Sequence, residues 1–221
     1  MFAAAGLAVV LAAALAPVTL AVPSAAPATC LVTEGAFTWG FKESFRAYVS
    51  GSIANGEWTT EGGIDYATPA FSSDELVGAL QLDGMTGELA VDGAMRFTGH
   101  DGILDTTISD PRLLFDGPDQ LVMVVNVTGT TQDFVEVSAV DVPFLTGELS
   151  TADWRVEGDT LVIDAIALEL TAEGADAFGT YPEGEPFDPL TLELDANADC
   201  AADAIDARAA TTVPVGLITV G

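Results

Sequence analysis

One histidine and a small number of tyrosines are the side chains of this sequence whose types and spacing point to chemistry. His100 is the only histidine, so several histidines of one chain cannot form a zinc site. A Ser-His-Asp triad would need the same residue, and no serine lies in a recognisable activating context. Nucleophile elbows, phosphate-binding glycine loops, EF-hand loops and cysteine-rich metal sites are missing as well. The motifs therefore favour a protein that binds a ligand over an enzyme.

Two helical segments interrupt an otherwise β-like sequence, and each leads to a tyrosine. In residues 41–49 aromatic side chains recur at helical spacing, and Ser44 lies one turn before Tyr48 on the same face. Residues 171–178 begin with a threonine suited to the N-cap and continue into Tyr181. The two helices are therefore expected to position the two tyrosines.

Each of these residues also has a simpler interpretation. Tyr48 fits the core-facing side of an amphipathic helix, and Tyr181 fits a loop in which it stacks on Pro182. His100 fits a turn or the edge of a sheet. The 34 acidic residues make carboxylate pairs unavoidable by chance, so a hydrolase that uses two carboxylates is an alternative without specific support.

The sequence between residues 33 and 194 predicts a mainly β fold. From Leu89 to Phe97 apolar residues alternate with other residues, as in a half-buried strand. Turn signals such as Asp101-Gly102 separate the strand-like runs. Further runs cover residues 103–108, 113–115, 121–127, 161–166 and 190–194. We expect an antiparallel β-sandwich or barrel-like domain with two short inserted helices.

The two ends of the sequence differ from this β region. Residues 1–28 carry no charged side chain and contain a long apolar run that leads to Ala26-Pro27-Ala28. This pattern predicts a signal peptide, although no Lys or Arg follows the first methionine. Residues 201–221 are rich in alanine and predict a tail or linker. A single domain is therefore expected over residues 29–200, secreted or held at the cell surface.

The only two cysteines, Cys30 and Cys200, lie at the two ends of the expected domain. In an exported chain this placement suggests one disulfide that ties the ends together. Two free thiols remain the alternative.

The charge of the sequence excludes several classes of partner. With 34 acidic and 6 basic residues, the formal net charge is −28. Such a surface repels the phosphates of nucleic acids and anionic lipid headgroups, so neither is an expected partner. Solubility or adaptation to salt is the simplest explanation of the acidity.

Three stretches, residues 37–48 (FTWGFKESFRAY), 96–105 (RFTGHDGILD) and 177–182 (AFGTYP), resemble the Htaa domain. That domain is the haem-binding module of cell-surface haem-uptake proteins in corynebacteria and related actinobacteria. The stretches occur in the family's order and at similar separations, so the likeness covers roughly residues 33–195.

The resemblance implies roles for four residues. Tyr48 matches the tyrosine that ligates haem iron in the family, and His100 matches the histidine that hydrogen-bonds that tyrosine. Ser44 and Tyr181 match residues expected to hold the haem edge and the propionates. Thr180 stands where a second aromatic residue is expected, which places one stacking contact in doubt.

The chemistry of tyrosine agrees with the implied role of Tyr48. A free phenol has a pKa of about 10, so iron or a hydrogen-bond donor must stabilise the phenolate at neutral pH. A phenolate is a hard anionic ligand that favours ferric iron, which suits the carriage of a b-type haem.

Other side chains near these residues have two interpretations. Lys42 and Arg46 could approach a propionate, although a solvated helix face is the simpler interpretation. Four aromatic side chains could cover the apolar face of haem, although core packing explains most of them at least as well. They are Trp39, Phe41, Phe45 and Phe97.

These observations favour a protein that captures ferric haem outside the cell. It would pass the haem to another surface haem-binding protein or to a haem importer. The main alternative is a secreted β-sandwich for adhesion or carbohydrate binding, in which the helix, Tyr48 and His100 only pack.

Overall fold

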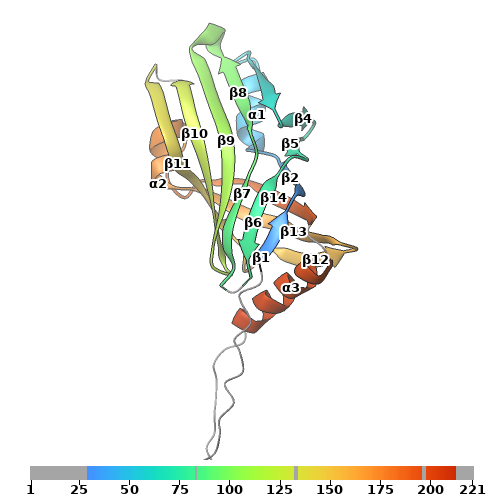
Figure 1. Cartoon of the computed structure of the whole chain (residues 1–221). Coiled ribbons are helices and arrows are strands. Elements are labelled where there is room, and N and C mark those ends of the chain that lie inside the picture. The colour runs from blue at the N-terminus through green and yellow to red at the C-terminus, as the bar shows by residue number, and fades with distance from the viewer. Residues whose placement is uncertain (1–28, 83, 132–133, 196–197, 213–221) are drawn as a thin grey trace, which may run out of the picture.

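The structure is a computed structural model and describes residues 29–82, 84–131, 134–195 and 198–212 (Figure 1). The predicted signal peptide, residues 1–28, lies outside the described residues, as do residues 213–221 of the expected tail. None of the helices in the described part is both long and apolar enough to span a membrane.

The described chain is mainly β, with strands that form one antiparallel sheet and three helices. The strands are β1 (Thr29–Val32), β2 (Glu34–Trp39), β3 (Glu57–Gly62), β4 (Asp65–Ala67), β5 (Ala70–Ser73), β6 (Val77–Gln81), β7 (Thr86–Ala90), β8 (Gly93–Gly99), β9 (Leu104–Asp116), β10 (Gln120–Thr130), β11 (Glu136–Glu148), β12 (Asp153–Glu157), β13 (Thr160–Leu170) and β14 (Pro186–Asp195). The helices are α1 (Glu43–Ser50), α2 (Ala172–Phe178) and α3 (Ala198–Thr212), with a 3-10 turn, η1 (His100–Gly102). The expected mainly β fold with inserted helices is confirmed.

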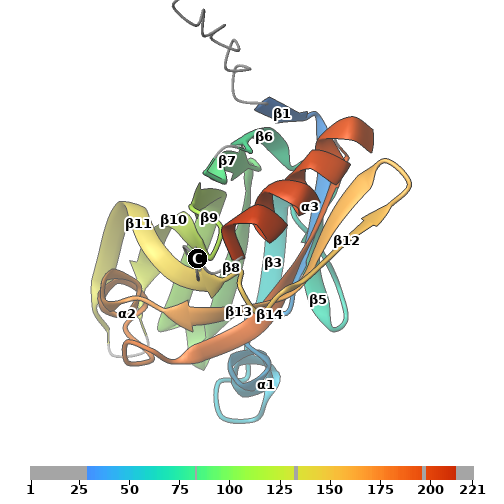
Figure 2. The same cartoon turned by 90° about the horizontal axis from the view of Figure 1, so that it is seen from below.

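The sheet is curled, and strands that are far apart in its order are close in the chain. Its main order is β1-β6-β7-β9-β10-β11-β13-β14-β2-β5-β4, while β12 pairs with β13 and β8 pairs with β3 and β9. Strands β1 and β2 are far apart in this order, yet only Thr33 separates them in the chain. Figures 1 and 2 show the curled sheet with α1 and α2 toward one end and α3 toward the other.

Strand β9 shows why some strand boundaries predicted from the alternation of apolar residues were wrong. Two strands, 103–108 and 113–115, were expected, but β9 runs unbroken from Leu104 to Asp116. Alternate side chains are buried up to Ile108, and the alternation shifts by one position around Asp110, which has a φ of 53°. An extra residue at a β-bulge reverses the faces without ending the strand. Conversely, the single strand expected over residues 89–97 is split into β7 and β8, which both pair with β9.

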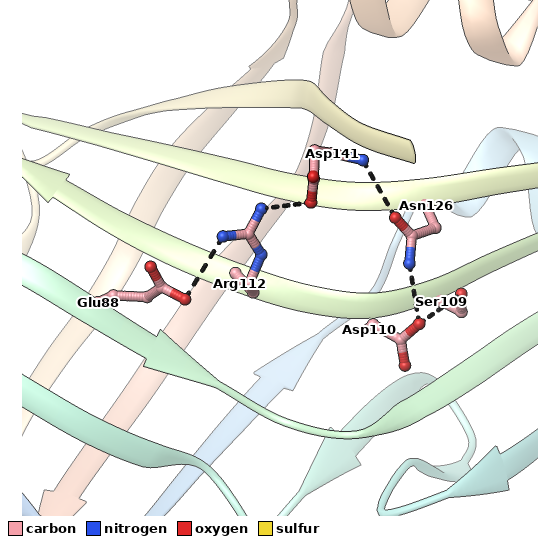
Figure 3. Close-up of polar contacts among 6 residues, drawn as sticks. All are labelled: Glu88, Ser109, Asp110, Arg112, Asn126 and Asp141. Atoms are coloured by element: carbon pink, nitrogen blue, oxygen red, sulfur yellow. Dashed lines mark hydrogen bonds and ion pairs between the residues drawn. The ribbon is translucent and has the colours of Figure 1, made fainter. Parts of the chain in front are cut away.

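A polar network on the outer surface joins this bulge to a second one (Figure 3). Asn126 donates from Nδ2 to the Asp110 carboxylate at 2.9 Å, and its Oδ1 accepts from the Asp141 backbone N–H at 3.0 Å. Asp141 is also left-handed, with a φ of 54°, and its carboxylate accepts from Arg112 at 2.7 Å. Arg112 reaches Glu88 on β7 at 3.5 Å. The network therefore stabilises two left-handed residues, one on β9 and one on β11, the strands on either side of β10.

We predict that Asn126→Ala destabilises the fold by about 1 to 2 kcal/mol, because both bulges lose a hydrogen bond. The free energy of unfolding in urea measures this effect. Thr128→Ala, an exposed change on the same strand, is the matched control and is expected to stay within about 0.5 kcal/mol of wild type. Equal stability of the two variants would contradict a bracing role for Asn126.

Aromatic side chains fill the core where α1 and α2 meet the sheet. Phe41 lies at the centre, with a fully buried ring and a left-handed backbone at a φ of 62°. Its ring contacts those of Trp39, Phe45, Phe71, Phe97, Phe144, Phe178 and Phe187. Trp39, Phe45 and Phe97 are buried to the same degree. Core packing therefore accounts for these aromatic side chains. This was the simpler of the two interpretations that the sequence allowed.

The predicted disulfide is confirmed: Cys30 of β1 and Cys200 of α3 are linked, with their Cα atoms 5.7 Å apart. Helix α3 crosses the expected domain boundary at residue 200, so residues 201–212 are helical where a tail or linker was expected. Ala201 and Ala204 are buried in the core. Arg208 donates to the Ser150 carbonyl at 2.8 Å. A small-residue face thus packs the helix closely, which composition alone did not indicate.

We predict that replacing both cysteines by alanine lowers the free energy of unfolding by about 2 to 5 kcal/mol. The link closes a sequence separation of 170 residues, and its loss frees the unfolded chain. Unfolding of the variant and of wild type, each with and without reductant, measures the effect. An unchanged midpoint in the variant would show that packing of α3 suffices without the link.

Candidate functional site

Tyr48 and His100 are in direct contact although they are 52 positions apart in the sequence. The Tyr48 hydroxyl is hydrogen-bonded to Nε2 of His100, and the two ring centroids are 5.7 Å apart. Tyr48 comes from α1, which lies beside β3 and β8 (Figure 1), and His100 opens the turn η1 that follows β8. Both side chains are half-buried. The phenol is thus polarised by an imidazole while it stays within reach of a ligand.

Helix α1 is oriented by a side chain from another part of the chain. Its N-cap residue, Lys42, makes no capping hydrogen bond from its side chain. Asp188 of β14 fills that role: its Oδ1 accepts from the Glu43 backbone N–H at 3.1 Å. Its other oxygen accepts from Arg46 of the first turn at 3.2 Å. A carboxylate is stabilised at a helix N-terminus, so β14 fixes the direction in which α1 presents Tyr48.

The backbone holds His100 in a left-handed conformation, with a φ of 53°, and Asp101 follows with a φ of 56°. Such a conformation is strained for residues other than glycine and is retained where the surroundings fix it. The His100 N–H donates to the Ala54 carbonyl at 2.7 Å. Ala54 follows α1 in the chain, so one hydrogen bond ties the histidine turn to the helix that carries Tyr48.

An ion pair braces the hairpin below this turn. Arg96 of β8 makes two hydrogen bonds of 2.7 Å to the Asp105 carboxylate of β9. These hydrogen bonds hold the pKa of the Asp105 carboxyl below its ordinary value. A carboxyl whose pKa is lowered on folding stabilises the folded protein at pH values above its ordinary pKa. This contribution is lost as the pH falls through the pKa that the carboxyl has in the folded protein. The brace therefore persists throughout the neutral range.

Tyr181 is linked to Tyr48 through the ring of Phe45. Helix α2 begins after Thr171, whose side chain accepts from the Gly174 N–H at 2.8 Å, so the predicted N-cap is confirmed. The half-buried Tyr181 ring lies 6.4 Å from the ring of Phe45, which in turn lies 6.2 Å from that of Tyr48. Phe45 thus contacts both tyrosine rings.

Ser44 is the fourth residue expected at the site. It lies one turn before Tyr48 on α1, as the sequence predicts, and its side chain is exposed. The described residues offer it no hydrogen-bond partner. The structure therefore leaves its hydroxyl accessible on the α1 surface.

Lys42 and Arg46 are not on a solvated face, contrary to the simpler interpretation. Lys42 forms an ion pair with Glu185 at 2.7 Å and Arg46 with Asp188 at 3.2 Å, and both bases are buried. The other four bases of the chain are paired as well. A propionate near α1 would therefore compete with a carboxylate that is already in place.

Two exposed apolar side chains, one in the turn after α1 and one between β10 and β11, were missed by the sequence analysis. Ile53 is 74% exposed and precedes Ala54, which holds His100. Phe134 is 70% exposed with a left-handed φ of 62°. Its N–H donates to the Thr131 carbonyl, and Thr131 packs against Gly179 at the end of α2. The sequence signal that could have identified these two side chains is an apolar residue within a turn-like stretch.

Groups of three or more His, Cys, Asp or Glu side chains that could hold a metal ion do not occur among the described residues. What the site offers is a single phenol with a hydrogen-bonded imidazole, a second tyrosine and nearby apolar surface. These groups are of types that can bind a ligand, and they lie in a domain of the antiparallel β class. The Htaa family model matches residues 34–193, and the chain belongs to this family.

Solved structures share this fold. The C-terminal domain of HtaA from Corynebacterium glutamicum is 28% identical, with a TM-score of 0.67, over 76% of this chain and 99% of that chain. The N-terminal domain of the same protein is 28% identical, with a TM-score of 0.56, over 74% and 97%. Haem-binding protein HtaB from C. glutamicum is 22% identical, with a TM-score of 0.61, over 78% and 98%. No curated protein sequence matches this chain.

Proposed function

We propose that this protein binds ferric, b-type haem through Tyr48, outside the cell or at the cell surface, and passes it on for haem or iron uptake. Membership in the Htaa family supports haem as the ligand. The fold shared with haem-binding HtaB agrees with this assignment.

The hydrogen bond between Tyr48 and His100 carries the proposal. Once Tyr48 is deprotonated, Nε2–H of His100 donates to the phenolate and stabilises the charged form. A phenolate stabilised in this way is a hard donor suited to ferric iron. The imidazole is turned to the tyrosine, so its proposed role is to support the ligand.

The remaining residues would bind the rest of the haem. Tyr181 and the exposed Ser44 would contact the haem edge and the propionates. Ile53 and Phe134 would cover part of the apolar macrocycle, since their exposed side chains gain from burial against it.

The proposed protein is a carrier and not an enzyme. Its partners would be haem and then a second surface haem-binding protein or a haem importer. The net charge of −28 makes nucleic acids and anionic lipid surfaces poor partners.

Titration of the purified protein with haemin tests the proposal. We expect one haem per chain, a sharp Soret band and the ligand-to-metal absorption of a ferric tyrosinate. A spectrum identical to that of free haemin would reject haem binding and leave an adhesion or carbohydrate-binding module as the alternative.

A further inference from the structure

Lys42 occupies a position that disfavours a lysine on two counts. It is the N-cap residue of α1, where the helix dipole is positive and repels a cation. It is also buried, with 7% of its surface exposed, and burial of a charge is costly unless the charge is paired. Serine, threonine, asparagine or aspartate would stabilise this helix end better. Helix stability therefore does not explain the residue.

The contacts of the Lys42 ammonium lie in the connection between α2 and β14 and at the start of β14, where the centroid of the Phe187 ring is 5.5 Å away. Nζ donates to the Pro186 carbonyl at 2.7 Å and pairs with Glu185 at 2.7 Å. It also lies 4.8 Å from the centroid of the Tyr181 ring, within the range of a cation–π interaction. One buried cation thus joins the start of the Tyr48 helix to the segment that carries the second tyrosine.

The second tie between these segments has a different role. Arg46 pairs with Asp188, which caps the helix, so this pair sets the direction of α1. No ring contact joins Arg46 to Tyr181 among the described residues. Of these two bases, Lys42 is the one that contacts both the ring of Tyr181 and the turn that follows it, in which Glu185 N–H donates to the Pro182 carbonyl at 3.2 Å.

We propose that Lys42 is a positioning residue that holds Tyr181 at a fixed place relative to Tyr48. This inference rests on the proposed function, because the spacing matters only if one ligand contacts both tyrosines. Without the ammonium, Tyr181 keeps its aromatic neighbours, Phe45 of α1 among them, but loses its charged contact with the start of α1. The second tyrosine then samples more positions, and a ligand must bear the cost of ordering it.

Lys42→Met tests the proposal, because methionine keeps an apolar stem and removes the charge. We expect haem affinity to fall about tenfold, as for loss of an outer-shell partner, while the tyrosinate absorption of Tyr48 persists. In a Tyr181→Ala background the same change is expected to alter affinity less than about twofold, because the group that Lys42 positions is gone. Equal effects in both backgrounds would overturn the proposal.

A measurement without haem separates this proposal from the proposed function. Hydrogen exchange of the Glu185 amide in the ligand-free protein is expected to be about tenfold faster in Lys42→Met, because the turn after Tyr181 is released. Arg155→Met, which removes an ion-paired base on β12, is the matched control and should leave both this exchange rate and haem affinity unchanged.

The outcomes are distinct. If wild type fails to bind haem, the proposed function is wrong, and unchanged exchange in Lys42→Met would reject the tie itself. If wild type binds haem and Lys42→Met binds it equally well, only the positioning role is wrong. Should Lys42→Met not fold, Glu185→Gln removes the same ion pair from a side chain that is 30% exposed. That variant should then show faster exchange in the turn and weaker haem binding, and wild-type values for both would overturn the proposal.

Discussion

Tyr48→Phe is expected to abolish the ferric tyrosinate spectrum and to weaken haem binding by at least about a hundredfold, beyond the effect typical of an outer-shell partner. Phenylalanine keeps the ring that packs 6.2 Å from Phe45 and removes only the donor atom. The fold should therefore survive, with a loss of about 1 kcal/mol for the broken hydrogen bond to His100. Haemin titration and unfolding in urea measure the two effects.

Tyr66→Phe is the matched control for this change. Its hydroxyl accepts a hydrogen bond from Arg46 at 3.3 Å, so the variant also deletes one partly buried tyrosine hydroxyl contact near α1. It should retain the wild-type haem spectrum. A Tyr48→Phe protein with wild-type spectrum and affinity would show that Tyr48 is not the iron ligand.

His100→Asn is expected to leave tyrosine ligation in place but to weaken haem binding about ten- to a hundredfold. Asparagine tolerates the left-handed backbone that His100 adopts, and its side chain is too short to replace the imidazole. The loss therefore reports the hydrogen bond to Tyr48 and not backbone strain. Since affinity changes appear mostly in dissociation, transfer of haem to apo-myoglobin should accelerate by a similar factor.

Asp101→Asn provides the control, because it changes the neighbouring left-handed residue of the same turn and leaves the imidazole intact. Its transfer rate should equal that of wild type. If His100→Asn also transferred haem at the wild-type rate, the contact with Tyr48 would have no part in retaining haem.

Local features of this protein followed from the sequence. The N-cap at Thr171 and the shared face of Ser44 and Tyr48 depend on residues within one helical turn of each other, so spacing alone predicts them. The mainly β character follows from alternation in the same way. The pairing of Cys30 with Cys200 followed from their being the only two cysteines of a chain expected to be exported.

The tertiary structure decided the features that join distant segments. The hydrogen bond between Tyr48 and His100 depends on how α1 packs beside β8, and the cap of α1 comes from Asp188 on β14, the strand paired with β2. The burial of Lys42 could not be predicted from the sequence, because its partners lie more than a hundred residues away along the chain. Bulges such as that at Asp110 reverse the alternation within a strand. Periodicity records only which side a residue faces, whereas the pairing of strands determines which residues meet, and that pairing is fixed by the whole curled sheet.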